Sequence, residues 1–339
     1  MKKRWIFAFS TLLVLSACGD NGDEETTADE NGGNGGDDGE VETGDMDADF
    51  ITIATGGTSG VYYPIGGAIS NLLEGELGAD SSVQSTGASV ENINLLDTDR
   101  AELAIVMGDA VSQAVEGTGP FEEEGAKEDL TAIASLYPNF VQVVTTEGSG
   151  IESIDDLAGH DVGVGDANSG VELNARMILE AHDMSYDDIN EDYLSYSEAI
   201  DQIQNGMIDA AFVTSGLPNA TVIDLSTTND AKIIPIEGEG LENLQELYPF
   251  FSEGTIPAGT YDNEDDITTA TIENLLIVNN ELSDDAVYDI TSAIFENIET
   301  IQGSHNAAEE ITLDTVEEGL PIPFHPGAER YFEEQGVLD

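Results

Sequence analysis

The sequence predicts an α/β protein of two lobes, and three observations support this. First, the apolar run Phe50–Ile53 breaks at ATGGTSG and then resumes at helical spacing, which is typical of a strand, a tight turn and a helix. Second, the segments Val83–Leu96 and Val162–Leu179 repeat this order. Third, 339 residues with 40% hydrophobic content are enough for two domains.

Strands are expected where short apolar or β-branched runs stop at turn residues. The run Ala101–Val106, for example, stops at Met107-Gly108-Asp109. The β-branched run Phe140–Thr146 is interpreted as the crossing into a second lobe. The other expected strands are Ala132–Leu136, Val162–Val164, Met207–Val213, Ala231–Ile236 and Ile272–Val278.

Helices are expected where apolar residues recur three and four positions apart. Besides the helices of the first two junctions, the expected helical segments are Ala110–Val115, Ile154–Gly159, Glu172–Ala181, Ser197–Asn205, Leu241–Tyr248 and Asp284–Thr300. Because the chain enters the second lobe once and returns, we expect two crossing strands to form a hinge. The predicted first lobe is residues 50–138 plus 240–339, and the predicted second lobe is residues 139–239.

The charge balance is strongly acidic, with Asp+Glu 70 against Lys+Arg 8 and a formal net charge of -62. Lys2, Lys3 and Arg4 account for three of the eight, so five basic residues follow them. Nucleic acid is excluded as a partner, because binding it requires clustered Lys and Arg. Repulsion among so many carboxylates destabilises a compact fold, but at about 1 M salt the screening length falls to about 3 Å. The acidic composition therefore indicates a protein adapted to a saline environment. The alternative is that an acidic linker inflates the total.

The N-terminus has the parts of a bacterial lipoprotein signal. A basic start, an apolar segment Trp5–Leu15 too short to span a membrane, and Leu15-Ser16-Ala17-Cys18 follow in order. This resembles a lipobox, which implies a signal peptide over 1–17 and lipidation of Cys18. The alternatives are an ordinary signal peptide or a short membrane anchor. The single cysteine excludes an intramolecular disulfide and a cysteine-based metal cluster.

Residues 18–49 are rich in Gly, Asp, Glu, Asn and Thr and nearly free of apolar residues. Such a segment buries too little surface to offset the entropy of ordering. We therefore predict a disordered tether between the lipidated cysteine and the folded body.

A longer series of motifs resembles a known family. The segments GGTSGVYYPIGGAI, STGASVENINLL, AELAIVMGDA, ASLYP, SIDDLAGHDVGVGDANSGVELNARMILE, MIDAAFVTSGLP and IPFHPGAERYFEEQG occur in order over Phe50–Gly336. They resemble the TAXI family of solute receptors from tripartite ATP-independent periplasmic (TRAP) transporters. One departure is Met107-Gly108-Asp109, where many relatives have a Gln-Ser-Asp-like turn.

The resemblance implies a type II periplasmic-binding-protein fold, in which two lobes close on a small solute. It also implies a membrane partner, a cation-coupled permease with a large and a small subunit. Characterised relatives are similar to receptors for glutamate, glutamine or C4-dicarboxylates.

The first junction offers the richest set of candidate ligand contacts. Glycines let a ligand approach the backbone, a helix start offers free N–H groups to anions, and hydroxyls and aromatic faces lie beside them. The alternative is a tight turn and helix cap without a ligand. The candidates here are Gly57, Thr58, Ser59, Gly60, Tyr62 and Tyr63.

Further candidates come from the other junctions and from strand ends, where ligands of α/β sheets bind. Arg176 suits a carboxylate or an ion pair with an acidic neighbour, and Asp109 suits a ligand ammonium group or a helix N-cap. Thr86, Ser89 and Asn92 are equally compatible with a capping box. The remaining candidates are Tyr137, Asn168, Ser169, Gly170 and Ser215.

No catalytic or metal-binding pattern supports an enzyme. His160, His182, His305 and His325 lack metal-ligand spacing, and the nucleophile-elbow signature is missing. We expect no cofactor and no metal. The sequence therefore predicts a lipid-anchored extracytoplasmic receptor that passes a small carboxylate solute to a TRAP-type permease. The alternatives are a sensory lipoprotein signalling to a membrane kinase, an enzyme, and an adhesive surface lipoprotein.

Overall fold

The structure, a computed structural model, describes residues 50–338. The predicted signal peptide (1–17), lipidation at Cys18 and acidic linker (18–49) lie outside the described residues. Within residues 50–338, no helix combines the length and the apolar character needed to cross a membrane.

A mixed sheet organises the described body, in the order β2-β1-β3-β10-β4-β7-β5-β6, with β8 beside β4 and β9 beside β10. Strand β1 is parallel to β2 and β3, and β5 is parallel to β6 and β7. The strands are β1 Phe50–Ala54, β2 Asp80–Gln84, β3 Leu103–Met107, β4 Leu130–Thr146, β5 Asp161–Gly163, β6 Asn190–Asp192, β7 Ala210–Ser215, β8 Ala231–Ile234, β9 Ser252–Ile256 and β10 Ile267–Asn279.

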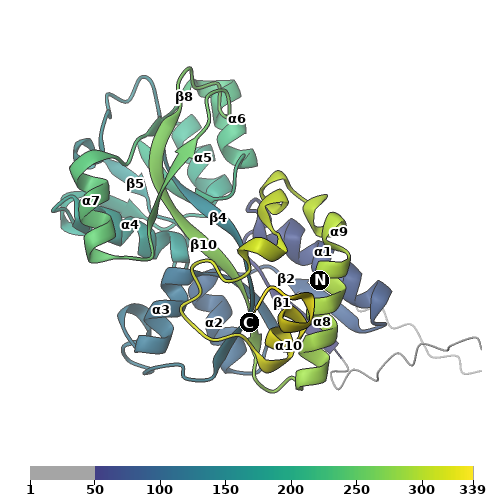
Figure 1. Cartoon of the computed structure of the whole chain (residues 1–339). Helices are drawn as coiled ribbons and strands as arrows, with labels where there is room; N and C mark the ends of the chain where they lie inside the picture. Colours follow the sequence, from purple (N-terminus) through teal and green to yellow (C-terminus); the bar gives the residue numbers. More distant parts are fainter. Residues whose placement is uncertain (1–49, 339) are drawn as a thin grey trace, which may run out of the picture. The chain divides into compact units, whose positions relative to one another are not determined.

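Two long strands connect the ends of this sheet (Figure 1). The first part of β4 pairs with β10, and its last part pairs with β7 and β8. Strand β10 pairs with β9 at its start and with β3 towards its end. We call the part built on β1–β3 the first lobe and the part built on β5–β8 the second lobe. The predicted α/β fold with two crossing strands is confirmed, while the lobe boundaries at 138/139 and 239/240 stay a prediction.

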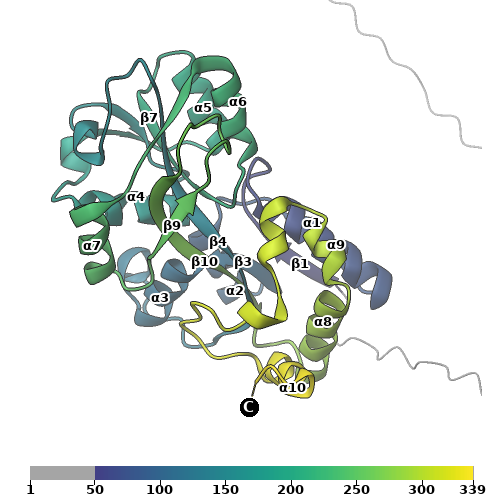
Figure 2. The ribbon, with the colours of Figure 1, turned by 45° about the horizontal axis from the view of Figure 1, so that its top comes forward.

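Helices cover the sheet; α8 and α9 lie beside α1, and α10 packs against α8 (Figure 2). Ile65, Ile69, Leu72 and Leu73 form the buried stripe of α1, at helical spacing. The helices are α1 Tyr62–Glu76, α2 Ser89–Asp97, α3 Gly108–Glu116, α4 Gly170–Ala181, α5 Tyr196–Gln204, α6 Ala220–Asn229, α7 Gly238–Leu247, α8 Asp284–Glu296, α9 Ile298–Gln302 and α10 Pro326–Gln335. Short 3-10 turns are Gly119–Phe121, Ile154–Leu157, Tyr186–Asp188, Asn306–Glu310 and Leu313–Thr315.

Two expected elements differ from the structure. The expected strands Ala132–Leu136 and Phe140–Thr146 are one continuous strand, β4, which contains Pro138. Pro138 pairs with Glu273 next to an irregularity in the β4–β10 register, the kind of position where a strand tolerates a residue without an N–H. The expected helix Asp284–Thr300 is divided into α8 and α9, because Asn297 leaves the helical conformation and its side chain donates to the carbonyl of Ala293.

Four elements were not expected from the sequence. Strands β6 and β9 are short and mostly exposed, so they lack the apolar alternation that predicts strands. Helix α6 buries only Val222 and Leu225. Helix α10 begins at Pro326 after His325, whose side chain accepts from the N–H of Gly327.

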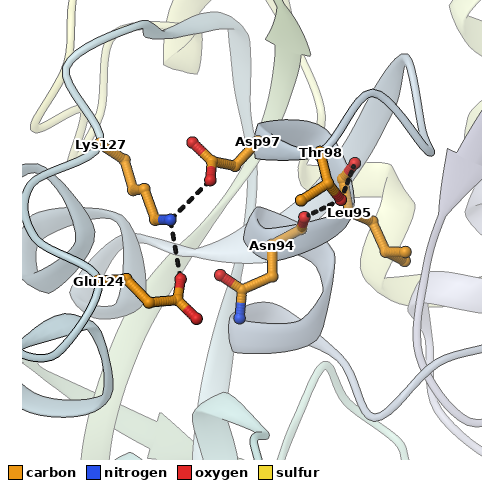
Figure 3. Close-up of polar contacts among 6 residues, drawn as sticks. All are labelled: Asn94, Leu95, Asp97, Thr98, Glu124 and Lys127. Atoms are coloured by element: carbon orange, nitrogen blue, oxygen red, sulfur yellow. Dashed lines mark hydrogen bonds and ion pairs between the residues drawn. The ribbon is translucent and has the colours of Figure 1, made fainter.

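A buried lysine, Lys127, forms ion pairs at the end of α2 in the first lobe (Figure 3). The Lys127 side chain is only 8% exposed, and its Nζ lies 2.6 Å from Asp97 and 2.8 Å from Glu124. On the same helix end, the Thr98 hydroxyl donates to the carbonyl of Asn94 at 2.6 Å. The lysine therefore ties the segment after α3 to α2 through Asp97, while Glu124 of its own segment is its second partner.

We expect Lys127→Met to lower the free energy of unfolding by about 1–3 kcal/mol, because it leaves two carboxylates facing each other without a cation. The loss is below that of a fully buried pair, since Asp97 and Glu124 are 40% and 54% exposed. Arg330→Met is the matched control, because it removes the same charge from an exposed pair with Asp285 and should cost about 0–1 kcal/mol. Urea unfolding of both variants decides, and equal losses would contradict this role of Lys127.

Candidate functional site

A cavity of about 540 Å³, including its open mouth, lies at the junctions predicted from the sequence. Both lobes supply its walls. The lining residues are Gly56, Gly57, Ser59, Gly60, Val61, Tyr62, Gly87, Ala88, Met107, Tyr137, Asn139, Asp166, Ser169, Val171, Ser195, Tyr196, Thr214 and Ser215.

Helices α1 to α5 begin at this cavity, and they differ in how their first turns are capped. Ser169 caps α4 and Ser195 caps α5 with side-chain oxygens. Val61 before α1 and Ala88 before α2 provide no side-chain cap. The N–H groups of the first turn of α1, and those of Ser89 and Val90 in α2, are therefore available to an anionic group of a ligand. The next N–H of α2, that of Glu91, already donates to the carbonyl of Asn168.

The floor of the cavity is a buried polar network at the crossing of β4 and β10. The Tyr62 hydroxyl donates to Asn274 Oδ1 at 2.5 Å, and Asn139 Nδ2 donates to the same oxygen at 2.9 Å. Asn274 Nδ2 in turn donates to the carbonyl of Tyr137 at 2.8 Å. Burial raises the pKa of Tyr62 well above its usual value, so the hydroxyl keeps its proton.

Three polar atoms of lining residues are buried without a hydrogen-bond partner in the described part of the chain. They are the Tyr137 hydroxyl, Asn139 Oδ1 and Thr214 Oγ1. Buried polar atoms are nearly always paired in folded proteins. These atoms are therefore candidate contacts for a polar solute.

The charge of the cavity is negative. Among its lining residues within 50–338 there is no Lys, Arg or His, and the one carboxylate is Asp166. Burial raises the pKa of Asp166, and the nearby charges of Glu198 and Glu91 add to this effect. A ligand with a protonated amine would compensate this carboxylate, whereas an anion has no side-chain cation to pair with.

The structure brings part of the predicted set of ligand contacts together. The predicted residues that line the cavity are Gly57, Ser59, Gly60, Tyr62, Tyr137, Ser169 and Ser215. Thr58 and Tyr63 are exposed at the surface of the first junction. Thr86 and Asn92 hydrogen-bond each other and the carbonyl of Thr55.

Other predicted residues lie at contacts between the lobes or in a neighbouring groove. Ser89 accepts from the N–H of Met107, and Asp109 accepts from Asn174 of α4. Asn168 and Arg176 line the separate groove between α3 and α4. The Arg176 Nε lies 2.5 Å from Glu172, and its guanidinium stacks on Tyr186.

Sequence analysis did not propose several lining residues, among them Asn139, Asp166, Tyr196 and Thr214. Asp166 lies in the quoted motif GVGDANSG and Thr214 in MIDAAFVTSGLP, so the motifs had marked both regions. Asn139 follows Tyr137-Pro138 directly, and its position after an expected strand was the available signal, although the structure places it inside β4.

The lobes touch closely beside the cavity. The N–H of Glu91 donates to the carbonyl of Asn168 at 3.3 Å, and Asn219 Nδ2 donates to the carbonyl of Ser59 at 3.5 Å. A Cβ at Gly170 would lie 2.2 Å from Met107 Cε and 2.9 Å from Ser89 Oγ. The start of α4 therefore fits against the first lobe only without a side chain.

Comparisons with known proteins identify a family and proteins of similar fold. A model of the NMT1-like family matches residues 53–336. A solved structure of a Bordetella bronchiseptica RB50 protein aligns at TM-score 0.52 with 17% identity, over 86% of this chain and 82% of that one. The structure of a periplasmic transporter aligns at TM-score 0.51 with 13% identity, over 76% and 87%. The aliphatic sulphonate binding protein SsuA of Escherichia coli aligns at TM-score 0.43 with 14% identity, over 84% and 78%.

We expect Gly170→Ala to favour separated lobes, because the added Cβ displaces Met107 and meets the less mobile Ser89. The cost to the closed form is about 1–3 kcal/mol. Small-angle X-ray scattering should show a larger radius of gyration for this variant. Gly67→Ala on α1 is the control, since its Cβ would meet nothing within 4 Å. An unchanged radius in Gly170→Ala would show that this contact does not limit closure.

Proposed function

The chain belongs to the NMT1-like family, and from this premise we propose that it is a receptor that binds a small solute between its two lobes. The observation that carries the proposal is the cavity itself, which both lobes line. It combines uncapped helix starts with buried polar atoms that lack partners. Closing two lobes excludes water and strengthens hydrogen bonds to a bound ligand.

The solute of this proposal carries a carboxylate and a protonated amine. The carboxylate accepts from the first N–H groups of α1 and α2, which have no side-chain cap. The amine faces Asp166, which has no cation beside it in the cavity. A small amino acid such as glutamate or glutamine meets both requirements, whereas a dicarboxylate meets only the first.

The receptor then delivers its solute to a membrane permease. The motif series resembling TAXI receptors supports a TRAP-type permease, and the lipobox-like segment at Cys18 supports an extracytoplasmic, lipid-anchored protein. Lobe closure changes the surface offered to a permease, so delivery can depend on occupancy.

We expect L-glutamate and L-glutamine to stabilise the protein and glutarate, which differs from glutamate only by the missing amine, to do so far less. A ligand at a hundredfold excess over its Kd adds about 2.7 kcal/mol. Thermal unfolding in molar salt measures this effect. Stabilisation by glutarate equal to that by glutamate would contradict the role of the amine.

Asp166→Asn tests the same contact from the protein side. Removing one charged partner of a hydrogen bond costs about 1.5–3 kcal/mol, or roughly tenfold to hundredfold in Kd. Glu198→Gln is the control, because Glu198 lies near Asp166 but belongs to the capping box of α5 and does not line the cavity. Isothermal titration calorimetry should show a change of Kd below about threefold for the control, which is under 1 kcal/mol.

A further inference from the structure

A carboxyl–carboxamide pair joins the lobes beside the cavity. Asp109 opens α3, which follows β3 in the first lobe, and Asn174 lies on α4, which follows β5 in the second lobe. Asn174 Nδ2 donates to Asp109 Oδ2 at 2.7 Å, and both side chains are fully buried. This hydrogen bond exists only while α3 and α4 are in contact.

The pair is incompletely satisfied if Asp109 is ionised. Among residues 50–338, Asp109 Oδ1 and Asn174 Oδ1 are both buried without a partner, and both are acceptors in that state. A protonated Asp109 can donate from Oδ1 to the amide oxygen of Asn174. One proton on Asp109 therefore supplies the donor that the Asn174 oxygen lacks and removes a buried charge.

Within residues 50–338, the charged and titratable groups on the elements that pack against α3, and on α1, provide no cation for Asp109. On α4, Arg176 is bound to Glu172. On α1, Tyr62 is a neutral phenol whose pKa is raised first by its own burial and further by the charge of Asp109. Glu91 of α2 accepts from the N–H of Gly87, and Glu273 of β10 is another carboxyl.

Burial also acts on Asp109 directly. It raises the pKa of Asp109 to about 7, against the lowering effect of hydrogen bonds from the backbone of Ala110 and Asp109 and from Asn174. The ordinary pKa of an aspartate is 3.8. The group is thus protonated more readily when it is buried than when it is hydrated.

We propose that Asp109 and Asn174 form a proton-binding site between the lobes, which is filled when the lobes close. A link between this proton and transport rests on the proposed receptor function. If the lobes close on a solute, capture of that solute also takes up one proton. The pair acts through lobe geometry, so these are positioning residues and not ligand contacts.

The direction of the pH effect follows from the two states. In separated lobes Asp109 is hydrated and ionises near its ordinary pKa of 3.8, whereas in closed lobes it ionises at a pKa of about 7. Below pH 4 both states are protonated and closure is insensitive to pH. Between pH 4 and 7 closure takes up a proton, so the ratio of closed to open molecules falls up to tenfold for each unit by which the pH rises. Above pH 7 both states are ionised and the ratio levels out at its lowest value.

The test needs no solute, so its outcome is independent of the receptor proposal. The full chain carries Cys18→Ser and cysteines at the exposed positions Glu74 of α1 and Asp201 of α5 for fluorescence energy transfer. We expect transfer to fall as pH rises from 5 to 8 in this parent protein. Constant transfer over this range would overturn the proposal.

Three variants assign the effect. Asp109→Asn should remove the pH response, and Asn174→Ala should give low transfer already at pH 5, because Asp109 then lacks its partner. Burial also raises the pKa of Glu273 to about 7, and its charged neighbours are Glu318 and Glu310. Because these neighbours do not include Asp109 or Asn174, Glu273→Gln should respond to pH like the parent. A pH response that survives Asp109→Asn, or that disappears in Glu273→Gln, would overturn the assignment to Asp109. High transfer at pH 5 in Asn174→Ala would overturn the role of the pair.

Discussion

The single acceptor shared by Tyr62 and Asn139 fixes the geometry on which the rest of the body depends. Asn274 Oδ1 receives both hydrogen bonds, and the amide of the same side chain donates to Tyr137. This buried network ties the start of α1 to both crossing strands. The start of α1 and the cavity floor are therefore expected to move together with β4 and β10. The lobes can then separate by bending of these two strands.

Scarcity of positive charge shapes both the stability and the chemistry of this protein. Four of the five basic residues after position 4 are bound to carboxylates: Lys127, Arg176, Lys232 and Arg330. The cavity therefore offers backbone N–H groups to an anion and a carboxylate to a cation. Molar salt weakens repulsion between surface carboxylates more than it weakens partly buried pairs. The saline environment stays a prediction from composition.

Local patterns predicted much of the fold and the position of the site, because the junctions of strand, turn and helix are short-range features. Gly57, Ser59, Gly60 and Ser169, which the sequence predicted as ligand contacts, line the cavity, and Ser169 also caps α4; their contact with a ligand stays a prediction. The i,i+4 spacing of Glu172 and Arg176 is typical of an ion pair on one helix, and the structure shows that pair. By contrast, Asn139 and Asn274 are 135 positions apart, and only the pairing of β4 with β10 brings them together. Long-range pairing of this kind leaves no periodic signal in the sequence.

The claim that the lobes close on a solute is tested most directly by hydrogen exchange at the amide of Glu91, which donates across the lobes to Asn168. The account predicts that this amide, together with the amides at the starts of α1 and α2, exchanges more slowly when a mixture of amino acids is added. Exchange at Glu91 that stays the same with every solute, while amides of the buried strand β3 are equally protected throughout, would contradict closure on a ligand.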